Sequence, residues 1–291
     1  MRITEKMVIH GMMDDIQSHL VQIAHMQEQV STGKRIHRVS DDPNAASKTI
    51  DIKFTISGLE QYKKNADEAS AWMSNTLTNL GQVRGIINEA KVLALQGGTD
   101  TLTPEARQTS ARVIERLAAR LYDVANSKWE GQTVFGGHKT STAAFTQTGV
   151  YQGDDGVMRR SIGPGEFVQV NYGGEQVFKD GVDIFQALND LKTAFENNDI
   201  PAISATLDDW DEALGNVLKL EAVMGSDSER VEAAKTRLEE GQFTLKELLS
   251  KNEDVDLAQA IVQLQSLQNV YQAALSVGSQ LLQQSLLRFL K

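Results

Sequence analysis

Residues 43–98 read PNAASKTIDIKFTISGLEQYKKNADEASAWMSNTLTNLGQVRGIINEAKVLALQGG. Apolar side chains recur there at every seventh position, a spacing that predicts the seam of a coiled coil. The members of this row are Ile52, Leu59, Ala66, Met73, Leu80, Ile87 and Ala94. Asp42 before Pro43 predicts a capped helix start, and Gly97-Gly98 predicts its end. At about 1.5 Å per residue, the roughly 50 residues between these signals predict a helix about 75 Å long.

A second row with the same spacing lies in the C-terminal half of the chain. Its members are Ile203, Trp210, Val217, Met224, Val231, Leu238 and Leu245. Two such rows of similar length indicate two long helices that pack on each other. We interpret both rows as an internal core, in preference to a seam between subunits.

Between the two rows the character of the sequence changes. Residues 132–178 are rich in Gly, Thr and Val, and residues 167–172 alternate as in a strand. Residues 152–156 (QGDDG) are typical of a hairpin turn. Helical periodicity resumes near Asp183. We predict a mainly α protein, an elongated antiparallel coiled-coil helical bundle with a small β-rich inserted domain.

Three parts follow from this order of elements. Residues 45–130 and 184–254 are expected to form a central helical rod, and residues 131–183 a β-rich outer insert. Residues 1–44 and 255–291 are expected to form terminal helices, an assembly coiled coil that is disordered in the monomer.

Each terminal segment carries one apolar stripe but no complete core. The candidate assembly residues on these stripes are Ile9, Met13, Ile16, Leu20, Ile23, Leu264, Tyr271, Leu275, Leu282, Leu286 and Phe289. Isolated amphipathic helices are marginally stable in water. The stripes should therefore fold fully only against each other or against neighbouring subunits, and both readings remain open.

A charged loop follows the first stripe. Lys34, Arg35 and Arg38 precede Asp41 and Asp42. Such a cluster is either a solvated loop or a patch of ion pairs between subunits. We include Arg35, Asp41 and Asp42 among the candidate assembly residues.

The composition argues against several classes of function. A formal net charge of −10 disfavours nucleic acid, whose phosphates attract clustered Lys and Arg. The absence of Cys excludes disulfides, iron–sulfur clusters and zinc sites with Cys ligands. No run approaches the roughly 20 apolar residues that span a membrane, and no cleavable signal stands at the N-terminus.

The polar residues show no catalytic pattern. The five His residues lack the spacing with Glu that marks a metal-hydrolase helix. Carboxylates occur side by side, as in Asp14-Asp15, and adjacent helical residues point in different directions. We therefore predict no catalytic residue, no metal, no cofactor and no enzyme activity.

Short segments at both ends and in the middle carry a resemblance to a known family. They are 31–36 (STGKRI), 40–43 (SDDP), 45–47 (AAS), 131–137 (GQTVFGG), 151–154 (YQGD), 254–258 (DVDLA), 272–275 (QAAL) and 285–287 (SLL). Together they resemble the flagellin and hook-associated protein family along nearly the whole chain. Val134 departs from the family pattern, which usually has Tyr before Phe-Gly-Gly.

The resemblance implies a structural subunit of the bacterial flagellum that joins hook to filament as an axial adaptor. It implies self-assembly into a ring, contact with a neighbouring hook-associated protein and with flagellin, and a cytosolic export chaperone on the C-terminal segment. It also implies export to the extracellular flagellum by the flagellar type III apparatus, without a cleavable signal. The alternatives are a short flagellin that forms the filament itself, and a non-flagellar coiled-coil scaffold or adhesin.

Overall fold

The computed structural model describes the backbone of residues 5–99 and 102–289, and the side chains of residues 7–99 and 102–280. The side chains of Leu282, Leu286 and Phe289 therefore lie outside the described residues. The chain divides into two units, which are described separately below. Unit 1 comprises Met1–Gly58 and Gln242–Lys291, and unit 2 comprises Leu59–Gly241.

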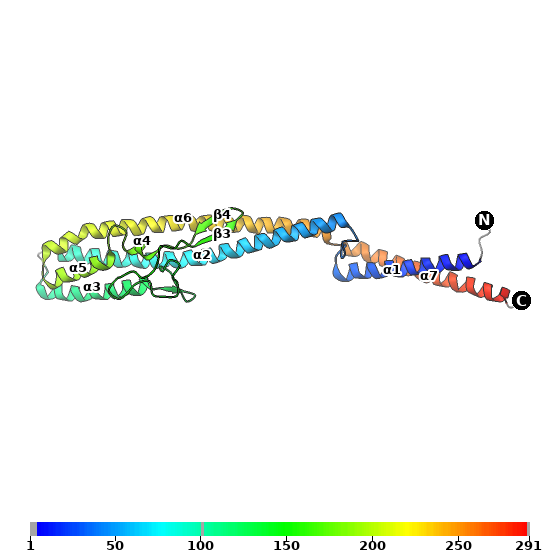
Figure 1. Cartoon of the computed structure of the whole chain (residues 1–291), viewed down its shortest axis with the longest axis horizontal. Coiled ribbons are helices and arrows are strands. Elements are labelled where there is room, and N and C mark those ends of the chain that lie inside the picture. Colours follow the sequence, from blue (N-terminus) through cyan, green and yellow to red (C-terminus); the bar gives the residue numbers. More distant parts are fainter. Residues whose placement is uncertain (1–4, 100–101, 290–291) are drawn as a thin grey trace. The chain divides into compact units, whose positions relative to one another are not determined.

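The described residues are mainly helical, as predicted, and Figure 1 labels the elements. The helices are α1 (Glu5–Thr32), α2 (Pro43–Gly97), α3 (Pro104–Ala125), α4 (Gly174–Phe178), α5 (Ile184–Glu196), α6 (Ile200–Glu253) and α7 (Leu257–Phe289). The predicted start of α2 is confirmed, because the Asp42 carboxylate accepts a hydrogen bond of 3.0 Å from the Ala45 amide. The predicted end at Gly97 is confirmed as well.

In unit 2, α2 and α6 run antiparallel and share a core (Figure 1). Asp67 pairs with Lys235 at 3.0 Å and Arg84 with Glu221 at 3.1 Å, so residue numbers rise along α2 as they fall along α6. The seven-residue rows are at most 1% exposed over 66–94 and 203–231. Over these residues the rows form an internal core, as the sequence predicted, whereas the row members Ile52, Leu59 and Leu245 are only partly buried.

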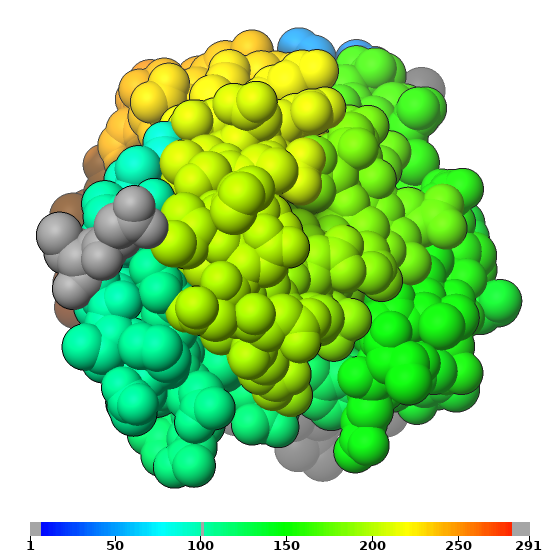
Figure 2. Space-filling view, turned by 90° about the vertical axis from the view of Figure 1, so that its left-hand side faces the viewer, coloured from blue at the N-terminus to red at the C-terminus, as the bar shows by residue number. Residues whose placement is uncertain are grey.

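Helices α3 and α5 pack against each other within this unit. Thr103 caps the start of α3, and the Asp183 carboxylate accepts hydrogen bonds from the first amides of α5. Figure 2 looks onto the end of the unit, where residues near the start of α6 (yellow) stand between α3 (blue-green) and the insert (green).

The insert contains two small antiparallel sheets. One pairs β1 (Lys128–Trp129) with β2 (Gln132–Thr133), and the other pairs β3 (Arg159–Gly163) with β4 (Glu166–Gln169). The hairpin therefore turns at residues 163–166, and the turn predicted at residues 152–156 is wrong as a hairpin. That stretch is a loop folded around the Asp154 carboxylate, which accepts hydrogen bonds from the His138 and Gly156 amides.

The predicted strand over residues 167–172 is shorter than expected. Strand β4 ends at Gln169, and the Met158 amide donates to the side chain of Asn171 at 2.7 Å instead of to a ladder carbonyl. Aromatic rings anchor the insert to the helices, with the Phe145 centroid 5.1 Å from that of Phe178 and 5.0 Å from that of Phe185. The insert thus shares one core with the helices of unit 2.

In unit 1, α1 packs against α7. The first residues of α2 and the last turns of α6 belong to the same unit, so the division falls at Gly58 and Gln242 and not at the predicted 44/45 and 254/255. The reason is that hydrogen bonds tie these helix ends to the loop after α1, as the next subsection shows. Among the described residues, no helix combines the length and the apolar character that crossing a bilayer requires.

Candidate intersubunit assembly site

The charged loop of residues 33–42 meets the junction of α6 with α7 inside unit 1. Gly33 ends α1 with a φ of 72°, a conformation that glycine adopts without strain, and its amide donates to the Gln29 carbonyl at 2.9 Å. On the other side, the Asp256 carboxylate accepts bonds from the Ala258 and Gln259 amides and caps the start of α7. Both helix ends are therefore fixed where the two chain segments meet.

Two backbone hydrogen bonds join the segments. The Arg35 amide donates to the Glu253 carbonyl at 2.7 Å, and the Val255 amide donates to the Gly33 carbonyl at 2.9 Å. They form an isolated antiparallel bridge between Lys34 and Asp254. This bridge is the point at which the N-terminal and C-terminal segments of unit 1 are held in register.

A buried carboxylate lies under the bridge. Glu253 is 3% exposed, and its two carboxylate oxygens form ion pairs with the ammonium groups of Lys34 and of Lys53, the latter at 2.6 Å. Burial raises the pKa of Glu253, but the hydrogen bonds from the two lysines outweigh that effect and lower it. The bond to Glu253 in turn raises the pKa of Lys34, so Lys34 and Glu253 both stay charged at neutral pH.

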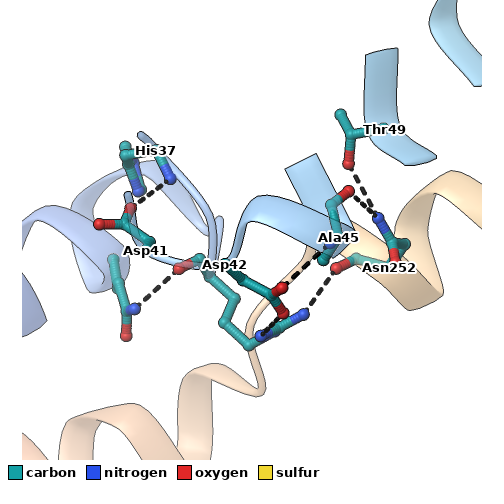
Figure 3. A network of polar contacts seen from close by, with 8 residues as sticks. His37, Asp41, Asp42, Ala45, Thr49 and Asn252 are labelled. Atoms are coloured by element: carbon teal, nitrogen blue, oxygen red, sulfur yellow. Dashed lines mark hydrogen bonds and ion pairs between the residues drawn. The ribbon is translucent and has the colours of Figure 1, made fainter. Parts of the chain in front are cut away.

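Asn252 fastens the end of α6 to the first turns of α2, as Figure 3 shows. Its side-chain amide donates to the Ala45 carbonyl at 2.8 Å and to the Thr49 hydroxyl at 2.9 Å. The backbone carbonyl of Asn252 accepts a hydrogen bond from the Arg35 guanidinium at 3.1 Å. Arg35, a predicted assembly residue, is thus engaged within the chain, and the same group lies 3.5 Å from the Asp42 carboxylate.

The two aspartates of the loop have internal roles. Asp41 accepts from the amides of Arg38 and His37 at 2.8 and 3.0 Å, and these bonds lower its pKa. The bond from the Ala45 amide lowers the pKa of Asp42 in the same way. Their predicted contact with other subunits stays a prediction.

Sequence reasoning missed three members of this network, Glu253, Lys53 and Asn252. The available signal was the interruption of the apolar row at residues 252–254. A break in periodicity indicates that a helix ends there, but it does not reveal which residues lie opposite.

The terminal stripes meet along α1 and α7 but remain largely open. Ile9, Met12 and Ile16 line an apolar groove of about 280 Å³ together with Leu275 and Gly278. The structure thus brings together the predicted residues of both ends at this point. The other described members of the stripes differ in exposure, with Ile23 at 8%, Met13 at 62%, Leu20 at 45%, and Leu264 and Tyr271 partly buried.

Exposed and buried apolar side chains are distributed unequally between the units. Of the 24 large apolar side chains exposed among the described residues, 16 belong to unit 1, although it is the smaller unit. Its buried apolar residues are few: Ile23, Ala45, Ala46, Ile56 and Ala260. By contrast, every member of the large buried core cluster belongs to unit 2. Such an open apolar surface is typical of an interaction site.

Among the described side chains, no group of three or more His, Asp or Glu residues is placed to hold a metal ion. The chemistry that the site offers is therefore apolar burial, ion pairing and backbone hydrogen bonding.

Comparisons with known proteins bear on this architecture. The family model for the bacterial flagellin N-terminal helical region matches residues 3–140, and that for the bacterial flagellin C-terminal helical region matches residues 207–290. Flagellar hook-associated protein 3 from Salmonella typhimurium is 28% identical over 252 residues, 78% of this chain and 80% of that protein. The protein of the same name from Escherichia coli is 28% identical over 61% of this chain and 57% of its own length.

Solved structures share the fold. The crystal structure of FlgL from Bacillus cereus is 23% identical, with a TM-score of 0.61, and the match covers 69% of this chain and 99% of that one. The two flagellin models together match well over half of the chain, at both of its ends. The chain belongs to the bacterial flagellin family.

Proposed function

We propose that this chain is a structural subunit of the bacterial flagellum that joins the hook to the filament. The observation that carries the proposal is the similarity to flagellar hook-associated protein 3, which in the Salmonella protein extends over most of both chains. The two units suit such a role. Unit 2 holds a closed core between long helices, and unit 1 leaves most of its apolar surface open.

The open surface of unit 1 gives the proposed assembly its driving force. Phe54 is 82% exposed and Phe243 is 72% exposed. Burying a side chain of this size stabilises an interface by about 1.5–3 kcal/mol. We expect neighbouring copies to cover these residues in a ring, with a hook-associated protein on one side and flagellin on the other.

The same surface needs protection before assembly. We propose that a cytosolic export chaperone covers the C-terminal segment and that the chain leaves the cell unfolded through the flagellar export apparatus. Residues 1–44 and 255–291 would then become ordered only on assembly. Limited proteolysis of the monomer should cut these ends while leaving a resistant middle, and uniform protection of residues 1–40 and 255–291 would contradict this part of the proposal.

Deletion of the gene tests the junction role directly. Cells without the protein should carry hooks without filaments and should release filament protein into the medium. Labelling of the wild-type chain on intact flagella should place it between hook and filament. Filaments that stay attached in the deletion strain would refute the proposal.

A short flagellin is the second candidate, because the family models describe flagellin itself. It predicts a different pattern of labelling, with the chain present along the whole filament. It also predicts that the purified chain forms long filaments on its own, which a junction subunit should not do.

A further inference from the structure

A basic pocket lies beside the bridge in unit 1. It has a volume of about 290 Å³ and is lined by the cations Lys34, Arg38 and Lys53 around the one carboxylate of Glu253. Lys34 and Lys53 are 44% and 49% exposed, so their ammonium groups can accept further partners from outside. The pocket thus carries an excess of positive charge in a chain whose formal net charge is −10.

The rim of the pocket is apolar. Val39 and Ile50 are among its lining residues, and they are 62% and 60% exposed. Arg38 forms no ion pair with any described side chain. A matching occupant would present a carboxylate flanked by apolar side chains.

One face of α1 has this pattern. Met7, Asp14 and Val21 follow each other at intervals of seven residues and so lie almost in line along the helix. Asp14 is exposed, while Met7 and Val21 are 64% and 66% exposed. This line lies opposite the groove formed with α7, which uses Ile9 and Met12.

Asp14 has no ion-pair partner among the described side chains. The helix packed against α1 supplies none, because α7 carries no charged residue over 257–280. The basic pocket of the same copy is out of reach, since 18 residues of helix separate Asp14 from Thr32 and span about 27 Å. A second copy displaced along the axis can reach it.

We infer that the basic pocket around Lys34, Arg38 and Lys53 receives Asp14 of a second copy of this chain, with Met7 and Val21 of that copy against Val39 and Ile50. The inference rests on the proposed function, because it needs the chain to assemble with itself. Pocket and occupant lie on different patches of one subunit, so the contact is heterologous and links copies head to tail. Repetition of this contact builds a ring when the rotation between copies closes.

Charge reversal tests the pairing. Asp14→Arg and Arg38→Glu each place like charges together and should lower the number of attached filaments per cell, since one exposed ion pair changes an affinity by up to about fivefold. The double variant restores opposite charges and should return the number to near that of the wild type. Asp209→Arg, an exposed reversal in unit 2, is the matched control and should have no effect. Failure of the double variant to recover would overturn the pairing.

Disulfide trapping adds a readout that does not depend on motility. The chain contains no Cys, so Asp14→Cys with Val39→Cys introduces the only two thiols. Oxidation of flagella from these cells should give oligomers larger than dimers, because a disulfide needs Cα atoms within about 7 Å. Asp14→Cys with Val150→Cys is the control pair and should give none, since Val150 is exposed in unit 2.

The outcomes separate this inference from the proposed function. Attached filaments without trapped oligomers would overturn the pairing while leaving the junction role intact. Trapped oligomers from a chain that labels the whole filament would support the pairing and refute the junction role. A trapped product with a different protein would overturn the assignment of a second copy.

Discussion

Replacement of Glu253 by Gln should loosen the bridge between the two ends of unit 1. The substitution keeps the shape of the side chain but removes the charge that Lys34 and Lys53 share. Breaking a fully buried ion pair costs about 3–5 kcal/mol. Here both lysines are almost half exposed and water can solvate them. We therefore expect the free energy that stabilises the bridge to fall by a smaller amount, about 1–2 kcal/mol.

Hydrogen exchange on the assembled chain, in which both ends are ordered, measures this loss locally. The amides of Arg35 and Val255 donate across the bridge and exchange only when it opens. A loss of about 1–2 kcal/mol predicts exchange about 5–30 times faster at these two amides. Glu247→Gln is the matched control, because Glu247 lies on the same helix and pairs with Lys251 at 2.7 Å on the surface. Equal exchange rates in the Glu253 variant and the wild type would refute the reasoning.

The bridge should also depend on pH in a defined direction. The pKa of Glu253 is lowered in the folded chain, so its contribution is complete above about pH 4.3, the unfolded value, and is lost as the pH falls through the folded value. The pKa of Lys34 is raised, so its contribution is present below about pH 10.4 and is lost as the pH rises through the folded value. After correction for intrinsic exchange, the Gln variant should lack the acid-side dependence at the bridge.

Two further predictions concern unit 2. Trp210→Ala removes a fully buried ring and should lower the free energy of unfolding by about 3–5 kcal/mol in urea, followed by circular dichroism, whereas Val92→Ala on the exposed side of α2 should change it by under about 0.5 kcal/mol. Gly137→Ala should destabilise more than Gly131→Ala in thermal unfolding. Both glycines have positive φ, which costs about 1–2 kcal/mol with a side chain, but only at Gly137 would the new Cβ lie 2.0 Å from the Asp154 carbonyl oxygen. Equal losses for the two glycine variants would contradict this account.

The sequence predicts those parts of the fold whose determinants are local. Asp42 before Pro43 caps α2 as predicted, and α5 begins near Asp183 as the resumed periodicity predicts, because each carboxylate meets amides only two or three residues away. The seven-residue rows are local in the same sense, since one period describes a whole helix. In the insert the determinants are not local, because the end of β4 depends on a hydrogen bond from the Met158 amide to the Asn171 side chain across the hairpin.

The candidate site depends even more on contacts between residues that are far apart in the sequence. The sequence indicates the charged loop and the break at residues 252–254, but the partners of Glu253 lie near the opposite end of the chain. No period or spacing connects residues so far apart. The prediction that Arg35 and Asp42 contact other subunits therefore could not anticipate that Arg35 contacts both Asp42 and the backbone carbonyl of Asn252 within the chain.

These contacts within the chain fix the positions of the residues on the open surface of unit 1. A ring of identical subunits requires each copy to hold its two contact patches in a fixed relation, because a heterologous contact closes only when the rotation between copies is a whole fraction of a full turn. Along α1, the helix from Asp14 to Thr32 fixes one side of that relation, and the bridge at Glu253 fixes the loop that carries Arg38. Loosening the bridge should therefore weaken the proposed contact even though Glu253 is 3% exposed and pairs with Lys34 and Lys53 of its own copy. On this reasoning the Glu253→Gln variant lowers the yield of oligomers trapped between Cys at positions 14 and 39, while Glu247→Gln leaves that yield unchanged.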